Sequence, residues 1–134
     1  GFIDNRGSGL LVAVHSIIPK KINLNLLLSI INSKFINWYH LKTFYAIRIP
    51  QGSLKYPVEF FNSLPIPANL VNNTYIEDLV ENIILNRSKN KDSNAFEQKI
   101  DNVIYKLYKL SFDEVKIIDP DFALSETEYN SIVI

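Results

Sequence analysis

The apolar positions between residues 22 and 44 follow a helical period. Side chains from Leu27 to Leu41 fall at spacings of three and four, which places them on one broad face of a helix. Asn23 or Asn25 is a suitable N-cap, because either amide oxygen can accept a hydrogen bond from a free backbone N–H of the first turn. The polar sequence NSK interrupts the apolar series and predicts a polar, basic face on this helix.

Two flanking segments have the pattern of strands rather than helices. The run "LLVAVHSII" (10–18) is continuously aliphatic between Gly9 and Pro19, which predicts a buried strand. The segment "YAIRIPQGSLKYPVEFFNSLPIP" (45–67) contains four prolines and begins with alternating side chains. Since proline is excluded from helix interiors, this segment predicts short strands joined by turns.

The second half of the chain has three capping boxes, each followed by an apolar stripe. The boxes are "TYIE" (74–77), "NAFE" (94–97) and "SFDE" (111–114). The first two predict helices joined by a short polar link, which should form an antiparallel hairpin. The third predicts a short helix that stops before Pro120, and no clear period follows in the last dozen residues.

These patterns predict an α+β fold in two parts. We expect residues 1–70 to form a small mixed α/β recognition lobe with short strands, and residues 71–134 a helical hairpin scaffold with a short C-terminal helix and an irregular tail. The first part has seven basic and two acidic residues, a balance of +5, and the second has seven and twelve, a balance of −5. Either the basic part faces a polyanion, or the imbalance is an ordinary fluctuation.

Composition excludes several classes of protein. The sequence contains no cysteine, which excludes disulfides and thiolate metal ligands and favours a reducing compartment, the cytoplasm. Two histidines are too few for a histidine metal cage without carboxylates. No apolar run reaches the roughly 18 residues of a membrane span, so no membrane partner is expected. Because the chain begins at Gly1 and contains no methionine, we expect it to be a piece of a longer protein.

No catalytic arrangement can be assembled from the sequence. A His–Ser pair at 15–16 lies in the predicted buried strand, where a core role is favoured. Asp119 and Asp121 flank a proline, a pattern that favours a helix stop over a metal pair. Trp38 and Tyr39 could stack on nucleic-acid bases, but their spacing favours core packing. The fragment itself is therefore predicted to carry neither a catalytic residue nor a metal.

Recognition of DNA fits the first part of the chain better. Its basic residues lie in or next to loops and helix ends, where they could bind phosphates. These phosphate-binding candidates are Lys20, Lys21, Lys34, Lys42, Arg48 and Lys55. Polar side chains in turns could reach base edges. These base-edge candidates are Asn5, Arg6, Gln51 and Ser53.

Three segments together resemble a known family. "LLLSIINSKFINWY" (26–39) resembles an LL-x-x-LNS-K helix, "FFNSLPIP" (60–67) resembles an LPIP exit segment, and "IDNVIYKLYKLSFDEVKII" (100–118) resembles a closing helix of the form D-x-x-V-Y-x-LY-x-L. In this order and approximate spacing they are similar to the TaqI-like C-terminal specificity domain of adenine-specific DNA methyltransferases. That family includes type II (IIG) restriction-modification enzymes with a fused nuclease.

The resemblance implies a target-recognition fragment of a bacterial defence enzyme. The parent would be an S-adenosylmethionine-dependent, adenine-specific DNA methyltransferase, with or without a fused endonuclease. Its catalytic domain and cofactor would lie upstream, because the Asn-Pro-Pro-aromatic motif is absent here. The expected partners are double-stranded DNA and that upstream domain. The closing helices would be a scaffold, and their core contacts would be Tyr105, Leu107, Tyr108 and Leu110.

An alternative function belongs to another class. The chain could be a protein-interaction or assembly module that docks through its helical hairpin and never touches DNA. An exposed apolar stripe on residues 75–86 or 95–109 would favour this alternative.

Overall fold

The computed structural model describes residues 17–19, 22–44, 56–67 and 73–134. Helix makes up 65% of this described part, which contains no strand. The predicted α+β fold is therefore wrong for these residues, where the chain is helical. Most of the two segments predicted as strands, residues 10–16 and 45–55, falls outside the described residues.

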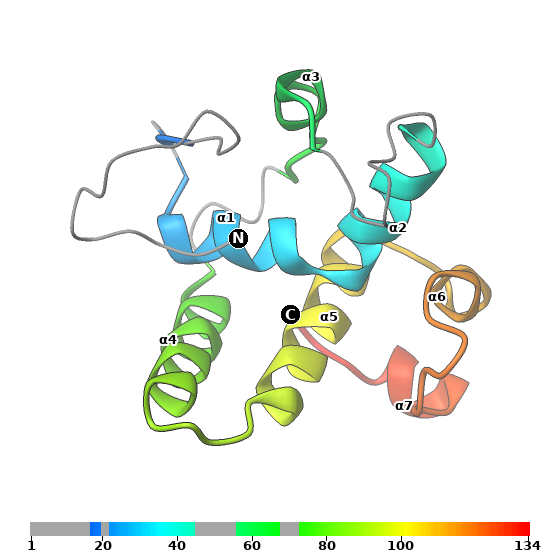
Figure 1. Cartoon of the computed structure of the whole chain (residues 1–134). Helices are drawn as coiled ribbons and strands as arrows, with labels where there is room; N and C mark the ends of the chain where they lie inside the picture. The colour runs from blue at the N-terminus through cyan, green and yellow to red at the C-terminus, as the bar shows by residue number, and fades with distance from the viewer. Residues whose placement is uncertain (1–16, 20–21, 45–55, 68–72) are drawn as a thin grey trace.

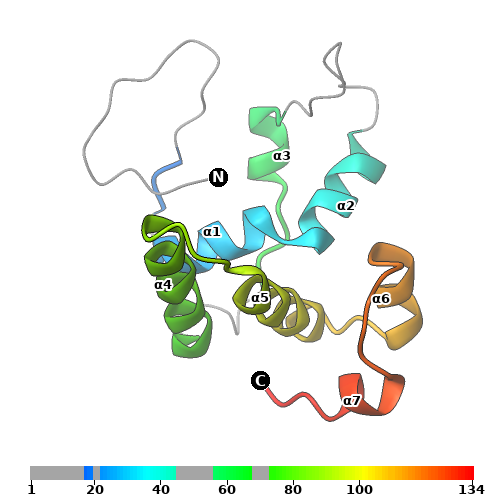
Figure 2. The same cartoon turned by 60° about the horizontal axis from the view of Figure 1, so that its bottom comes forward.

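The described residues form a series of short helices, which are labelled in Figure 1. They are α1 (Leu24–Asn32), α2 (Lys34–Thr43), α3 (Val58–Asn62), α4 (Thr74–Ser88), α5 (Asn94–Leu107), α6 (Phe112–Ile118) and α7 (Glu126–Asn130). Helices α4 and α5 lie side by side, and α1 crosses them, as both Figure 1 and Figure 2 show. Helix α2 contacts α5 and α6, and α6 contacts α7.

The single helix predicted between residues 22 and 44 is in fact two helices joined at Ser33. Ser33 has an extended backbone, with φ −67° and ψ 151°. Its N–H donates to the Ile30 carbonyl at 3.1 Å, while its hydroxyl oxygen accepts the Ile36 N–H at 3.2 Å. One residue thus ends α1 and caps α2, so the NSK interruption marks a break and not a polar face. At the other end of α1, Asn23 is the N-cap, as one of the two predicted alternatives.

Helix α3 corrects the prediction of strands and turns before the LPIP segment. It occupies five residues after Pro57, which is its N-cap, and it ends before Pro65. Proline disrupts a helix only from an interior position, so prolines outside both ends are compatible with a short helix between them. Packing then decides the structure, because the helix places Phe60 in the core with none of its surface exposed.

The three capping signals of the second half each mark the start of a helix, but two of the three N-caps lie one residue before the predicted position. Asn73, not Thr74, caps α4, and its side chain accepts the Ile76 N–H at 3.0 Å. The N-cap of α5 is Ser93, one residue before the predicted position. The capping box of α6 is confirmed, since Ser111 and Glu114 bond each other reciprocally.

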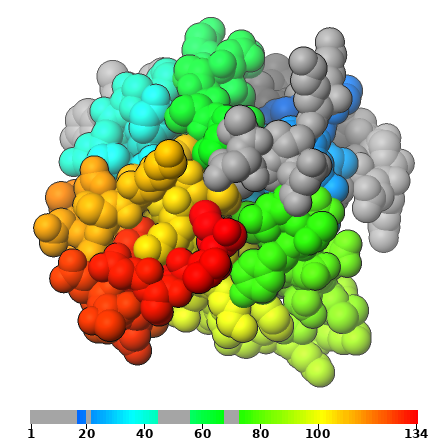
Figure 3. Space-filling view, turned by 180° about the vertical axis from the view of Figure 1, so that it is seen from behind, coloured from blue at the N-terminus to red at the C-terminus, as the bar shows by residue number. Residues whose placement is uncertain are grey.

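The tail predicted to be irregular contains a further helix. Ser125 and Glu128 form a second complete capping box, and α7 follows directly. The S-x-x-E signal is present in the sequence, but the helix is only five residues long and too short to show a period. Figure 3 shows the C-terminal segment, in red, lying against the back of α5.

Two apolar clusters hold the described helices together. The larger combines side chains from α1, α2, α3, α4 and α5, on both sides of residue 70. Its buried members are Leu26, Ile30, Ile36, Phe60, Ile76, Leu79, Val80, Ile100, Val103, Ile104 and Leu107. The smaller, formed by Tyr105, Val115, Phe122 and Tyr129, attaches α6 and α7 to α5. The scaffold residues expected at the end of α5 are thus buried or half-buried.

Candidate nucleic-acid interface

Two of the predicted DNA contacts, Lys34 and Lys42, lie among the described residues, at opposite ends of α2. The other candidates fall outside the described residues. They are Lys20, Lys21, Arg48, Lys55, Asn5, Arg6, Gln51 and Ser53. What the structure says about the interface therefore concerns α2 and the elements packed around it.

Lys42 lies in the last turn of α2 and is exposed. Its Nζ is 5.8 Å from the centre of the Trp38 ring, within the range of a cation–π contact. No carboxylate of the described residues forms an ion pair with it. A phosphate could therefore bind Lys42 without first displacing an acidic side chain.

Lys34 is held by two carboxylates at the start of α2. Its backbone N–H donates to Asp101 Oδ1 at 2.9 Å, and its Nζ donates to Asp119 Oδ2 at 2.7 Å. The Asp119 side chain is only 12% exposed, against 50% for Lys34. The Lys34 ammonium group is thus already paired with an acidic side chain of the same chain, and a phosphate contact by this residue stays a prediction.

The two carboxylates lie in a desolvated part of the structure. Burial raises the pKa of Asp101 to about 6, an effect partly opposed by the hydrogen bond and the charge of Lys34. The negative charges of Asp119 and Glu97 raise it further. Burial also raises the pKa of the nearby Tyr105 phenol, whose hydroxyl has no hydrogen-bond partner among the described residues.

An aromatic cluster fixes the C-terminal end of α2 against α3. The buried His40 ring stacks on Tyr56, with ring centres 4.1 Å apart, and on Phe44 at 5.8 Å. Phe60 meets His40 edge-on at 4.7 Å. The Tyr56 hydroxyl donates to Asn37 Oδ1, on the preceding turn of α2. This packing sets the position of the last turn of α2, from which Lys42 projects.

Trp38 and Tyr39 have different surroundings, although both are half-buried. Tyr39 packs against the larger core, and its ring lies 6.4 Å from that of Phe60. This contact confirms core packing for Tyr39. Trp38 instead lies beneath the Lys42 ammonium and beside the exposed end of α2.

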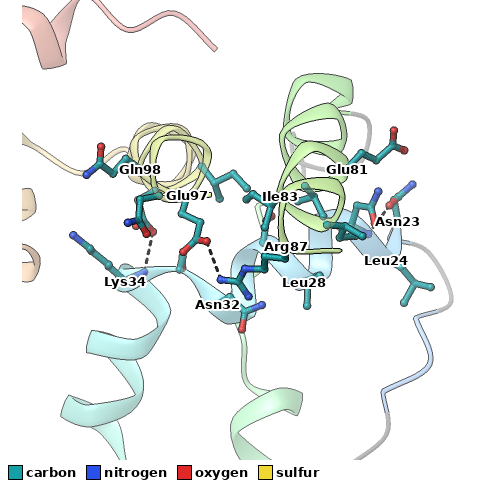
Figure 4. A pocket seen from close by; sticks show the side chains of 18 residues that line it. Asn23, Leu24, Leu28, Asn32, Lys34, Glu81, Ile83, Arg87, Glu97 and Gln98 are labelled. Carbon is teal, nitrogen blue, oxygen red and sulfur yellow. Dashed lines mark hydrogen bonds and ion pairs between the residues drawn. The ribbon is translucent and has the colours of Figure 1, made fainter. Parts of the chain in front are cut away.

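A groove with a volume of about 1240 Å³ lies between α1, α4 and α5 (Figure 4). Leu24 and Leu28 line it from α1, and Ile83 from α4. Arg87 and Glu97 point toward each other across it and form an ion pair of 2.8 Å. Sequence reasoning missed this groove, because its lining combines α1 with α4 and α5, which lie far from α1 along the chain.

The charges in the groove compensate one another. Glu97 Oε1 accepts hydrogen bonds from the Ser93 hydroxyl and from Arg87 Nη2. The bond from Ser93 is the largest cause of the lowered pKa of Glu97, and Arg87 adds to it. Because acidic groups offset the basic ones here, the groove has no excess of positive charge for a polyanion.

The described part of the chain was compared with two further patterns, a metal-ligand cluster and a membrane-spanning helix. No group of three or more histidine, cysteine or acidic residues comes together there as a metal site. Asp119 is the C-cap of α6, which confirms the helix stop expected around Pro120. Among the same residues, no helix combines the length and the apolar character needed to cross a bilayer.

Comparison with known proteins gives no relative for this chain. No family model, no curated protein sequence and no solved structure matches it.

Proposed function

We propose that this chain is a target-recognition fragment of a site-specific adenine DNA methyltransferase or of a fused restriction-modification enzyme. It would position duplex DNA for methylation by a catalytic domain upstream in the same protein, in the cytoplasm of a bacterium. That upstream domain would bind S-adenosylmethionine. The observation that carries the proposal is the ordered set of three motifs at residues 26–39, 60–67 and 100–118.

The packing of these motifs supports treating them as one unit. Ile30 and Ile36 from the first, Phe60 from the second, and Val103 and Ile104 from the third share the larger core. Segments far apart along the chain thus depend on each other for burial.

Within this proposal, α2 is the described element that would lie nearest to DNA. Lys42 would bind a backbone phosphate, and this contact adds affinity without selecting a sequence. Sequence would be read by polar side chains at base edges. The catalytic domain would then flip the target adenine out of the duplex before methyl transfer.

A titration tests the proposal directly. Fluorescence anisotropy of a mixed-sequence duplex is measured with the 134-residue chain at low salt and again at about 0.2 M salt. We expect binding that weakens steeply with salt. Lys42→Ala should reduce the slope of log K against log salt by about 0.9, the value for one phosphate contact.

Lys99→Ala is the matched control for this change. Its Nζ lies 6.0 Å from the Phe96 ring centre, a surrounding much like that of Lys42, but it projects from α5 and not from α2. It should leave the salt slope unchanged. Failure of the chain to bind duplex at low salt, at protein concentrations above about 10⁻⁴ M, would refute the proposal.

The alternative function, docking to another protein, has one observation in its favour. Ile84 and Leu85 on α4 are 46% and 49% exposed, and Ile84 lines the groove. The exposed Tyr75 does not extend this patch, because it lies about 13 Å from Ile84 along the axis of α4, at a rise of about 1.5 Å per residue. The docking alternative predicts no binding to duplex, so the same titration separates the two functions.

A further inference from the structure

Two hydrogen bonds connect the start of α2 to residues that are distant along the chain. Asp101, on α5, is 67 residues from Lys34, and Asp119, at the end of α6, is 85 residues from it. One residue donates to both, with its backbone N–H and its ammonium group. Lys34 therefore connects α2, α5 and the end of α6 at a single point.

Helices α6 and α7 form a small unit, residues 111–134, with its own attachment to α5. Tyr129 packs in the smaller core and donates its hydroxyl to the Leu110 carbonyl at 2.7 Å. Lys106 on α5 places its Nζ 4.0 Å from the centre of the Tyr129 ring. These contacts hold the unit on α5, and the ion pair between Lys34 and Asp119 connects it to α2.

We propose that Lys34 is a positioning residue: together with Asp101 and Asp119 it forms a clamp that fixes α2 on the α6–α7 unit. A largely buried carboxylate such as Asp119 requires a charged or hydrogen-bonding partner, and Lys34 supplies one. The first N–H of α2 supplies a partner for Asp101, where the helix dipole also favours a negative charge. Without the Lys34 ammonium group, Asp119 would lose its ion-pair partner, and Asp101 would keep only the backbone N–H.

The clamp and a phosphate contact make opposite predictions for Asp119. If Lys34 bound phosphate, Asp119 would compete with the DNA, and Asp119→Asn would strengthen duplex binding. If Lys34 is a clamp, Asp119→Asn and Lys34→Met both weaken the contact between α2 and the α6–α7 unit. This part of the reasoning rests on the proposed DNA function, whereas the clamp itself is a property of the folded chain.

Native-state hydrogen exchange of the whole chain tests the clamp without DNA. The amide of Phe122, which donates to the Asp119 carbonyl at 3.0 Å, reports opening at the end of α6. Four variants are compared: Lys34→Met, Asp119→Asn, the double variant, and Lys34→Arg. Lys42→Met is the matched control, because it removes an ammonium group from the same helix at its other end.

We expect exchange at the end of α6 to accelerate about two- to fivefold in each single variant, the range for a partly exposed ion pair. The double variant should exchange no faster than the singles, since both remove one interaction. Lys34→Arg should retain the slow exchange, and Lys42→Met should not change it. Unchanged exchange in Lys34→Met, or effects that add in the double variant, would overturn the clamp.

The duplex titration supplies the second readout. A clamp predicts that Lys34→Met leaves the salt slope unchanged and that Asp119→Asn does not strengthen binding. A slope lowered by about 0.9 in Lys34→Met, with tighter binding by Asp119→Asn, would make Lys34 a phosphate contact and overturn the clamp. If the chain binds no duplex, the proposed function fails, and hydrogen exchange alone decides the clamp.

Discussion

Replacing Asp101 with asparagine should make the protein more stable at neutral pH, although it removes one member of an observed hydrogen bond. Asparagine keeps an Oδ1 oxygen that can accept the Lys34 N–H, and it carries no charge. In the wild type, burial raises the pKa of Asp101 from 3.8 to about 6. The folded protein therefore bears a cost whenever this carboxyl group is ionised.

The size and sign of the effect follow from linkage. One pKa unit corresponds to about 1.4 kcal/mol, so a shift of about two units corresponds to about 3 kcal/mol. This is an upper value for the contribution of Asp101 to the free energy of unfolding. Because the folded-state pKa is the higher one, the contribution of neutral Asp101 is fully present below about pH 4. It declines as the pH rises and is lost above about pH 6.

Urea denaturation followed by circular dichroism, at intervals from pH 4 to pH 8, measures this difference. We expect wild type and Asp101→Asn to have similar stability at pH 4, and the variant to be more stable by up to about 3 kcal/mol at pH 7. Asp78→Asn, which changes an exposed carboxylate on α4, is the control and should show no such trend. A stability difference that stays constant with pH, or an Asp101→Asn variant that is weaker at pH 7, would refute the reasoning.

Three further changes test the packing and the caps. Phe60→Ala should lower the free energy of unfolding by about 3–5 kcal/mol, because Phe60 is fully buried. Val58→Ala, at a half-exposed position on the same helix, should change the free energy of unfolding by no more than about 0.5 kcal/mol in the same urea titration. Tyr105→Phe should leave stability unchanged or raise it by about 1 kcal/mol, because the deleted hydroxyl is buried without a partner among the described residues; a large loss would reveal a bond to this hydroxyl. Ser125→Ala should destabilise α7 by about 1 kcal/mol, which faster hydrogen exchange at the Tyr129 amide would show. Ser88→Ala, which changes a serine away from any N-cap, should leave exchange at Tyr129 unchanged.

The helices of the second half could be predicted from the sequence because their signals are local. Spacings of three and four identify the buried faces, and serine with glutamate three residues later identifies the start of α6. The start of α4 shifted by one residue, since Asn73 and Thr74 are both good caps and only the structure selects between them.

Predictions failed where distant contacts decide the structure. Helix α3 lies between prolines, and burial of Phe60 outweighs the composition of the segment. The NSK sequence predicts a polar face on one helix, but the Ser33 hydroxyl caps α2 and supports a break between two helices.

The local sequence around Lys34 predicts a phosphate ligand, because it contains no acidic residue. The carboxylates that hold it come from residues 101 and 119, which no local pattern connects to it. The groove between α1, α4 and α5 escaped prediction for the same reason, because its walls meet only in the folded chain.

The junction at Ser33 has a consequence for how this protein could change in length. Since a single residue separates α1 from α2, the two helices have no spare chain between them to absorb an insertion. One added residue that extended α2 at its start would turn the rest of that helix by about 100°. Trp38 and Lys42 would then face another direction, while the core of α1, α4 and α5 stayed in place. The turn between α4 and α5 is longer, and its residues 89–92 are exposed, so a tag or a loop could be inserted there at little cost.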